Sequence, residues 1–153
     1  MNSRRQSRKT LRTDAAAAVE SCAGWNGRLA MRRINQFLDR ELAGIGLSAA
    51  QLGLMAQIAA ATDDTLGALA LRSGLEQSTL SRNLRKLENS GLIEIATVES
   101  DLRRRMVWLT ETGARRLEAA LPVWRTANEE LARHISLDLT RRLARETETL
   151  AGD

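Results

Sequence analysis

The hydrophobic positions between Gln77 and Asn89 recur at the spacing of an α-helix. Leu80, Leu84 and Leu87 follow one another at intervals of four and three residues, so they share one face, which we expect to be buried. No acid lies between Ser78 and Lys86, and this stretch carries hydroxyl, guanidinium and ammonium groups away from the leucines: Ser78, Thr79, Ser81, Arg82, Arg85 and Lys86. The pattern predicts a helix that its leucines anchor and that offers cations and hydroxyls to a partner.

The residues before this helix predict a second, shorter helix that crosses it. Leu66, Leu69 and Ala70 give that helix a small apolar face, and Thr65 precedes it as a capping residue. Ser73-Gly74 then supplies the tight turn between the two helices. The arrangement is typical of a helix-turn-helix.

The residues after the helix predict a two-stranded hairpin. Gly91 can take the left-handed conformation that ends a helix. Residues 92–95 and 105–109 have the composition of strands, and residues 96–104 read as a polar, cationic loop between them. A solvated amphipathic helix would share the leucine pattern, but it would not need these neighbours. We therefore expect a helix-turn-helix with a wing.

Amphipathic helices flank this unit on both sides. Residues 14–42 read as one long helix, and Ser48 with Gln51 forms a capping box that opens another helix to about residue 61. After the wing, residues 111–135 form a helix that Pro122 should kink. A last helix extends from residue 138 or 140 to residue 150.

These elements divide the chain into four parts. We expect a basic disordered arm over residues 1–13, an N-terminal dimerisation helix over 14–47, a winged helix-turn-helix DNA-binding domain over 48–110 and C-terminal dimerisation helices over 111–153. A winged helix needs neither terminal segment, so a homodimer built from both ends is the favoured interpretation. An intramolecular helix pair would show the same pattern.

The charge balance favours a polyanionic partner. The net charge is +4, and of the 23 basic residues only Lys9 and Lys86 are lysine. Arginine suits phosphate and guanine recognition, although the same usage can record a GC-rich genome. Aromatic residues make up only 3% of the chain, which disfavours single-strand binders, because these stack bases on aromatic side chains.

Composition also bears on compartment and chemistry. The single cysteine, Cys22, cannot form an intramolecular disulfide, and no apolar run approaches the roughly 18 residues of a membrane-spanning helix. We therefore expect a cytoplasmic protein with no membrane partner.

His134 is the only histidine, and no glycine-rich phosphate loop or metal-ligand cluster is present in the sequence. We expect no enzyme, no metal site and no cofactor.

Two stretches resemble the MarR-type transcriptional regulators. STLSRNLRKLENSGLIE is similar to that family's recognition helix running into the first wing strand, and DLRRRMVWLTETG is similar to its wing signature. The matching positions of the signature are Asp101, Arg103, Val107, Leu109, Thr110 and Gly113. Leu102 departs from it, because an arginine is usual there; Arg104 and Arg105 follow. The resemblance implies a mainly α winged helix-turn-helix with a small two-stranded wing and a dimerisation region formed by the N- and C-terminal helices.

The resemblance implies a homodimeric regulator, expected to be a repressor, on a pseudo-palindromic operator in double-stranded DNA. The major groove would be read by Ser78, Thr79, Ser81 and Arg82, with Arg85 and Lys86 placed for phosphate. Arg103, together with Arg104, would enter the minor groove or clamp its phosphates.

The resemblance also implies a small aromatic or phenolic anion as the effector that releases the DNA. The residues that suit its pocket are Trp25, Arg28, Met31 and Met55, because aromatic and thioether surfaces bind planar rings and arginine binds carboxylate. Two alternatives stay open. Cys22 could sense oxidants, as in some members of that family, or be a small buried hydrophobe. The chain could also be a winged-helix interaction module that does not read sequence.

Overall fold

The computed structural model describes residues 2–98 and 101–150, and the side chains of residues 10–97 and 105–150. The chain divides into two compact units, Met1–Gln36 and Phe37–Asp153. Both are mainly helical, and the described strands form one antiparallel pair in the second unit. The predicted fold class is therefore confirmed.

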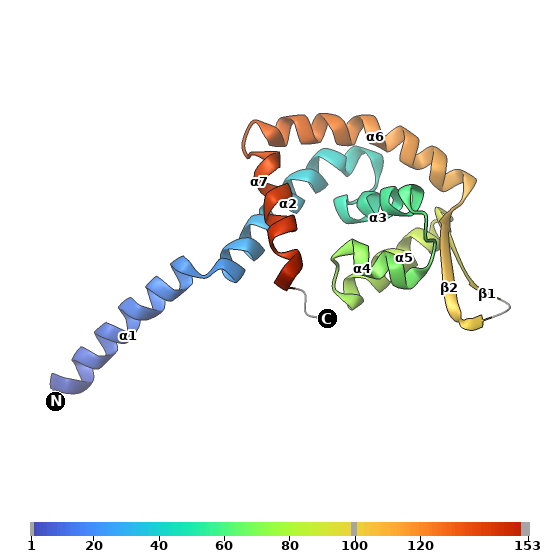
Figure 1. The fold of residues 1–153 in the computed structure, drawn as a ribbon. Helices are drawn as coiled ribbons and strands as arrows, with labels where there is room; N and C mark the ends of the chain where they lie inside the picture. The colour runs from blue at the N-terminus through green and yellow to red at the C-terminus, as the bar shows by residue number, and fades with distance from the viewer. Residues whose placement is uncertain (1, 99–100, 151–153) are drawn as a thin grey trace. The chain divides into compact units, whose positions relative to one another are not determined.

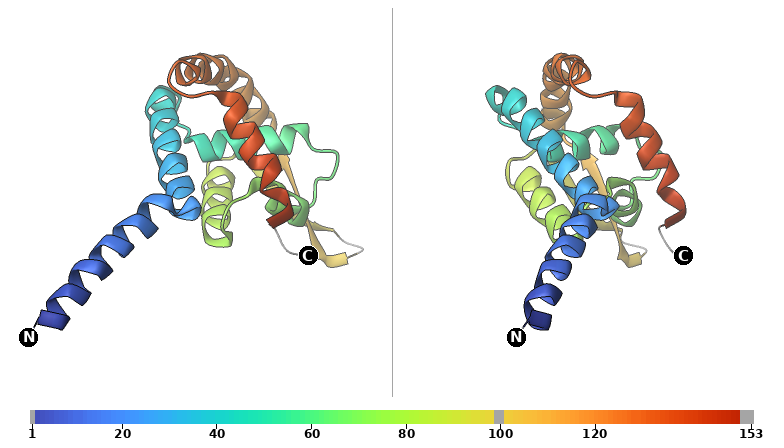
Figure 2. Two further views of the ribbon diagram at one scale, coloured as in Figure 1. Left: turned by 60° about the vertical axis from the view of Figure 1, so that its left-hand side comes forward. Right: turned by 90° about the vertical axis from the view of Figure 1, so that its left-hand side faces the viewer.

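The first unit is helical from its first described residue. Helix α1 spans Asn2–Ser21, and α2 spans Ala23–Leu42, which carries it into the second unit. Figure 2 shows the chain changing direction between the two helices, and Cys22 lies at this break. The structure has helix from residue 2, where a disordered arm over residues 1–13 was expected, and the expected single helix over residues 14–42 is interrupted at Cys22.

Local chemistry explains both corrections. No glycine or proline precedes Cys22, and the arginine, glutamine, leucine and alanine residues there have high helix propensity. At the break, polar side chains bond the backbone: Ser21 Oγ donates to the Ala17 carbonyl at 2.8 Å, and Asn26 Nδ2 donates to the Glu20 carbonyl at 2.8 Å. Such bonds compete with the helical ladder and end α1.

The second unit opens its first complete helix with the predicted capping box. The 3₁₀ turn η1 (Ala43–Ile45) is followed by α3 (Ala49–Ala60). Ser48 Oγ accepts a hydrogen bond from the Gln51 amide at 3.2 Å, and Gln51 Oε1 accepts one from the Ser48 amide at 2.9 Å. Both bonds satisfy donors that the first turn of a helix leaves unpaired.

The helix-turn-helix consists of α4 (Leu66–Ser73) and α5 (Gln77–Asn89). Thr65 caps α4 by accepting a hydrogen bond from the Ala68 amide at 3.3 Å. Gly74 closes α4 with a φ of 61°, in the left-handed region where a side chain would be strained. Each of these boundaries agrees with the sequence-based expectation.

The wing is the antiparallel hairpin of β1 (Ile93–Val98) and β2 (Asp101–Leu109), in which Ile93 pairs with Leu109. Both strands are longer than predicted: Ala96, Thr97 and Val98 pair with Met106, Arg105 and Asp101, and the register shifts between Thr97 and Val98. Backbone pairing continues past the apolar positions, since a hairpin satisfies its own amides and carbonyls whatever the side chains are.

The linker before α4 ties the helix-turn-helix to the wing. Thr65 forms a bridge to Met106, and the Val107 amide donates to the Asp64 carbonyl at 2.8 Å. These bonds add a short third segment beside β2. The sequence analysis did not predict them, because they join residues more than 40 positions apart.

The C-terminal part of the chain forms α6 (Glu111–Ala132), α7 (Leu137–Glu146) and the 3₁₀ turn η2 (Glu148–Leu150). Helix α6 ends before the predicted residue 135, because Ser136 caps α7 by accepting a hydrogen bond from the Leu139 amide at 3.4 Å. Pro122 lies inside α6, which continues through it. The predicted kink stays a prediction.

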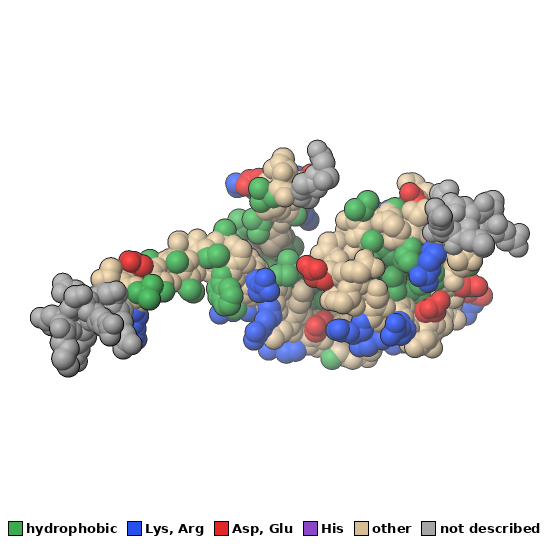
Figure 3. Space-filling model, turned by 90° about the horizontal axis from the view of Figure 1, so that it is seen from below, with side chains coloured by type: hydrophobic (Ala, Val, Ile, Leu, Met, Phe, Trp, Pro, Cys, Tyr) green, Lys and Arg blue, Asp and Glu red, His purple; other side chains and the backbone are tan. Residues whose placement is uncertain are grey.

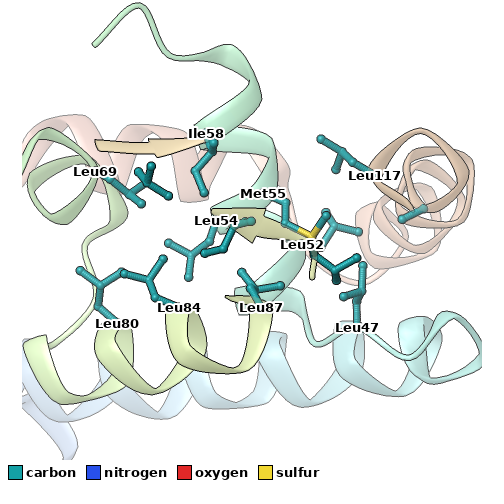
Figure 4. Packing of buried hydrophobic residues seen from close by; sticks show 14 of the residues in the cluster. Leu47, Leu52, Leu54, Met55, Ile58, Leu69, Leu80, Leu84, Leu87 and Leu117 are labelled. Carbon is teal, nitrogen blue, oxygen red and sulfur yellow. The ribbon is translucent and has the colours of Figure 1, made fainter. Parts of the chain in front are cut away.

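One hydrophobic core holds the winged helix together (Figure 4). Helix α3 contacts α4, α5, α6 and β2, so it is the central element of the unit. The three leucines that define the face of α5 are all buried, as predicted. Burying one leucine side chain contributes about 1.5–3 kcal/mol, which is sufficient to fix the orientation of a short helix.

None of the described helices alone is long and apolar enough to cross a membrane. Two helical segments joined by a bend, Ala23–Ile45 and Ala49–Ala60, reach the length and apolar composition of a membrane span only when they are counted together.

Candidate nucleic-acid interface

The exposed face of α5 carries the side chains that the sequence singled out. Ser78, Ser81, Arg82, Arg85 and Lys86 are exposed, whereas Thr79 is half-buried; the Thr79 carbonyl accepts a hydrogen bond from Asn83 Nδ2 at 3.0 Å. Figure 1 shows this helix beside the wing. The structure therefore brings these residues together on one side of a helix whose leucines are fixed in the core.

The N-terminus of α5 adds backbone donors that the sequence analysis missed. Glu76 is the capping residue, yet within the described part of the chain its side chain makes no capping bond. The first turn of α5 contains no acid, and the first amides of a helix have no intrahelical partner. Donors of this kind can bind phosphate oxygens, although the carboxylate of the capping Glu76 lies at the same helix end.

A cleft of about 470 Å³ lies between α4, α5 and the wing. Its apolar floor is made by Leu66, Ala70, Leu80, Leu84 and Ile95. Ser81 and Arg85 reach it from α5, and Arg105 reaches it from β2. Figure 3 shows basic side chains close to exposed hydrophobic surface on this face of the molecule.

Arg105 is the basic wing residue whose side chain the structure describes. It is exposed, it pairs with Thr97 across the hairpin, and it lines the same cleft as Arg85. In the sequence it was only the last of three arginines that follow Leu102. The backbone of Arg103 and Arg104 belongs to β2, but the predicted roles of these two side chains lie outside the described residues.

Thr110 links the base of the wing to α6 through two side-chain hydrogen bonds. Thr110 Oγ1 donates to the Gly91 carbonyl at 2.6 Å and accepts a hydrogen bond from the Gly113 amide at 2.9 Å. Thr110 therefore caps α6 and also holds the turn that ends α5. Gly91 has a φ of 68°, as its predicted left-handed role requires.

The comparisons with known proteins agree with this geometry. The family model described as MarR family matches residues 45–104, which include α3, α4, α5 and most of the wing. The transcriptional regulator MosR of M. tuberculosis, solved in complex with DNA, is 30% identical to this chain, with a TM-score of 0.75; the match covers 85% of this chain and 96% of MosR. The chain belongs to the MarR family.

Two further known proteins are similar to this chain. Transcriptional regulator HosA of Escherichia coli is 34% identical over 82 residues, which are 46% of this chain and 61% of HosA. The solved structure of MarR is 27% identical with a TM-score of 0.62, and the match covers 82% of this chain and 96% of MarR. The family and the winged-helix fold predicted from the sequence are confirmed, and the chain stands among DNA-binding transcriptional regulators.

The residues predicted to bind an effector fall in both units of this MarR-family chain. Trp25, Arg28 and Met31 are exposed on α2 in the first unit. Met55 is fully buried in the core of the second unit, where it packs as an ordinary core side chain. Its predicted role as a pocket-lining residue is corrected, because a side chain with no exposed surface has none to offer a ligand.

The thiol of Cys22 is exposed at the break between α1 and α2. The interpretation of Cys22 as a small buried hydrophobe assumed a continuous helix with an apolar stripe; in the single chain Cys22 is exposed at the helix break instead. Among the residues that the structure describes, no group of three or more His, Cys, Asp or Glu side chains is placed to hold a metal ion.

Proposed function

We propose that this MarR-family chain is a homodimeric repressor that binds a pseudo-palindromic operator in double-stranded DNA. The observation that carries the proposal is the exposed face of α5, which presents hydroxyls and cations from a helix held by three buried leucines. A helix fits the major groove, where arginine pairs bidentately with guanine and hydroxyls reach base edges or phosphates. MosR, which is similar over 85% of this chain, was solved with DNA.

Each side chain has a distinct role in this proposal. Base edges would be read by Ser78, Thr79, Ser81 and Arg82, which lie in the first half of α5. Arg85 and Lys86 lie one turn further on and would contact phosphates. Arg103 and Arg104 of the wing would meet the minor groove, where an A·T-rich sequence concentrates negative potential.

The proposed homodimer rests on apolar surface that a single chain leaves uncovered. Leu139 and Leu143 lie one turn apart on α7 and are 61% and 54% exposed, and Leu150 of η2 is also exposed. Arg141, Arg142 and Arg145 occupy other positions of the same helix, so α7 is strongly amphipathic. A second copy of this chain is the proposed partner for the leucine face.

A mobility-shift titration tests the proposed function. The full chain is titrated against the DNA upstream of its own gene, in the presence of excess unrelated competitor DNA. We expect a competitor-resistant complex whose protection pattern has two halves, as a symmetric dimer requires. Equal affinity for operator and competitor would contradict the proposal and favour a winged-helix interaction module that does not read sequence.

The proposed release of DNA by a small aromatic or phenolic anion rests on the exposed side chains of α2. Trp25 offers a ring face and Arg28 a guanidinium one turn away, a combination that suits an aromatic acid. A thermal-shift screen of aromatic acids identifies the effector. Trp25→Ala should abolish the shift, and retention of the full shift would exclude Trp25 from the site.

A second candidate function, release of DNA by oxidants, is favoured by the exposure of Cys22. An exposed thiol can be oxidised, whereas a buried one is protected. Peroxide should then dissociate the wild-type complex but not the complex of Cys22→Ser. Equal dissociation of both complexes would exclude this function, and Cys22→Ser without peroxide serves as the control for DNA binding.

A further inference from the structure

The first unit carries the positive charge of the chain. It has eight basic and two acidic residues, whereas the second unit, which contains the winged helix, has 15 basic and 17 acidic residues. The net charges of the two units are therefore +6 and −2, which together give the net charge of +4 of the whole chain. Because DNA is a polyanion, the net charge of the second unit opposes its approach at long range. The long-range attraction between this chain and DNA has to come from the first unit.

Five of these basic residues lie on one side of α1. Arg4, Arg8 and Arg12 are four residues apart, and Arg5 and Lys9 repeat this spacing one position further on. Positions four residues apart are neighbours on the surface of a helix, so the five positions form one band, which we call the basic stripe. At a rise of about 1.5 Å per residue, the basic stripe is roughly 12 Å long. Figure 2 shows α1 as one continuous helix over this stretch.

The basic stripe is unfavourable for a helix that stands alone. Like charges four residues apart repel each other and destabilise a helix, and the basic stripe contains three such pairs. The first acid of α1 is Asp14, which follows the last cation of the stripe. Burial does not compensate over the part of α1 whose side chains the structure describes, because every residue from 10 to 21 is exposed. A bound polyanion would remove the repulsion and so stabilise α1.

The composition of this stretch favours double-stranded DNA over other polyanions. A helix that lies on a membrane needs an apolar face, but Leu11 is the only apolar residue between residues 2 and 13. Single-stranded nucleic acids stack their bases on aromatic side chains, and the first aromatic residue of the chain is Trp25. Duplex DNA needs neither feature, since it presents one phosphate charge per about 1.7 Å of its axis, a density comparable to that of the basic stripe.

We propose that α1 is a further DNA-binding element, whose basic stripe binds phosphates of double-stranded DNA without reading the base sequence. Arginine and lysine neutralise phosphates and release counterions, a gain that depends on charge and not on the bases. The stripe adds affinity for operator and for random DNA alike, and it raises the association rate of a chain whose second unit is negatively charged. This inference rests on the proposed function only in that DNA is the partner, because the preference for an operator belongs to α5 and the wing.

Two variants of the full chain test the basic stripe. The glutamine variant removes all five charges and keeps a residue type of high helix propensity: Arg4→Gln, Arg5→Gln, Arg8→Gln, Lys9→Gln and Arg12→Gln. The exchange variant moves two cations to the other side of α1 without changing the net charge: Ser3→Arg, Arg4→Ser, Ser7→Arg and Arg8→Ser. Thermal unfolding of both variants and of the wild type checks that the second unit keeps its stability.

Fluorescence anisotropy with labelled operator and labelled random duplex gives Kd over a series of salt concentrations. For the glutamine variant we expect the affinity for random duplex to fall at least about tenfold, and the slope of log K against log salt to fall by up to about four units per chain. The exchange variant should lose up to about two units per chain, because three of the five cations stay on the stripe. The ratio of operator affinity to random affinity should stay constant, because the stripe does not read bases.

Four results would overturn the proposal. An unchanged affinity of the glutamine variant for random duplex would exclude a contact with DNA, and an exchange variant that binds like the wild type would reduce the effect to net charge. A loss of operator affinity alone would mean that α1 reads sequence. Tighter binding of the wild type to phosphatidylserine vesicles or to polyglutamate than to duplex DNA, at equal salt, would assign the stripe to a membrane or to an acidic protein.

Failure of the proposed function gives a different result. A wild-type chain without operator preference, whose affinity for random duplex still falls in the glutamine variant, would contradict the proposed function and support the basic stripe.

Discussion

Gly113 lies directly against the main chain of Leu92. A methyl group built on Gly113 would stand 1.8 Å from the Leu92 carbonyl oxygen and 2.8 Å from the carbonyl carbon. The same oxygen accepts a hydrogen bond from the Thr110 amide at 3.1 Å. Helix α6 can therefore approach the base of the wing this closely only because residue 113 has no side chain.

Gly113→Ala should lower the free energy of unfolding by about 1–3 kcal/mol, the usual cost of overpacking, because a backbone contact cannot move aside as a flexible side chain can. Urea denaturation followed by circular dichroism measures the change. Gly53→Ala is the matched control: Gly53 is also inside a helix, and nothing lies within 4 Å of its built methyl group. It should be neutral or stabilising by up to about 1 kcal/mol. Equal stability of both variants would contradict the close contact.

Thr110→Ala should cost about 1–2 kcal/mol, because it removes the cap of α6 and the bond to the Gly91 carbonyl together. Thr110→Ser keeps the hydroxyl and should recover most of the loss. Thermal unfolding of the three proteins is the measurement. A serine variant as unstable as the alanine variant would show that the threonine methyl group, and not the hydroxyl, is what matters.

Arg82→Ala should relax base preference and cost about 1–3 kcal/mol per half-site, the range for a bidentate base contact. Arg85→Ala is the companion experiment, because the loss of a phosphate contact should lower the affinity for operator and for random DNA by the same factor. Competition titrations with single-base operator variants measure both. If Arg82→Ala loses the same factor on every sequence, Arg82 contacts phosphate and its assignment to a base is wrong.

Arg103→Ala should reduce the salt dependence of operator binding. With two wings per dimer, the slope of log K against log salt should fall by at most about two units. Arg104→Ala and Arg105→Ala extend the test along β2, and the smaller effect is expected for Arg104. An unchanged slope in Arg103→Ala, with the dimer intact, would mean that this residue of the wing does not touch DNA.

Leu143→Glu should dissociate the proposed dimer and leave the winged helix folded, because Leu143 is 54% exposed in the single chain and a charge there would be desolvated only at an interface. Sedimentation velocity at micromolar concentration measures the change. Arg141→Gln, on the same helix, changes the net charge by the same one unit at an exposed position and is the control for charge. A wild-type chain that is itself monomeric at this concentration would contradict the dimer.

The sequence by itself determined the features that depend on residues close along the chain. Ser48 with Gln51, Thr65 and Gly91 mark helix boundaries because a cap acts on amides only a few residues away. The leucine spacing of α5 determined which face is buried, because residues three and four positions apart lie on the same face of a helix. The wing signature, from Asp101 to Gly113, indicated the family for the same reason, since its residues are close together in one hairpin and one helix start.

Only the tertiary structure decided the features that depend on distant residues. The lengths of β1 and β2 follow from pairing across the hairpin, and the bridge from Thr65 to Met106 joins two segments that no local pattern connects. The burial of Met55, the exposure of Cys22 and the meeting of Arg116 with Ile45 likewise depend on which elements pack together. Periodicity shows which face of an element is apolar, but packing decides which partner covers it and which polar groups then meet.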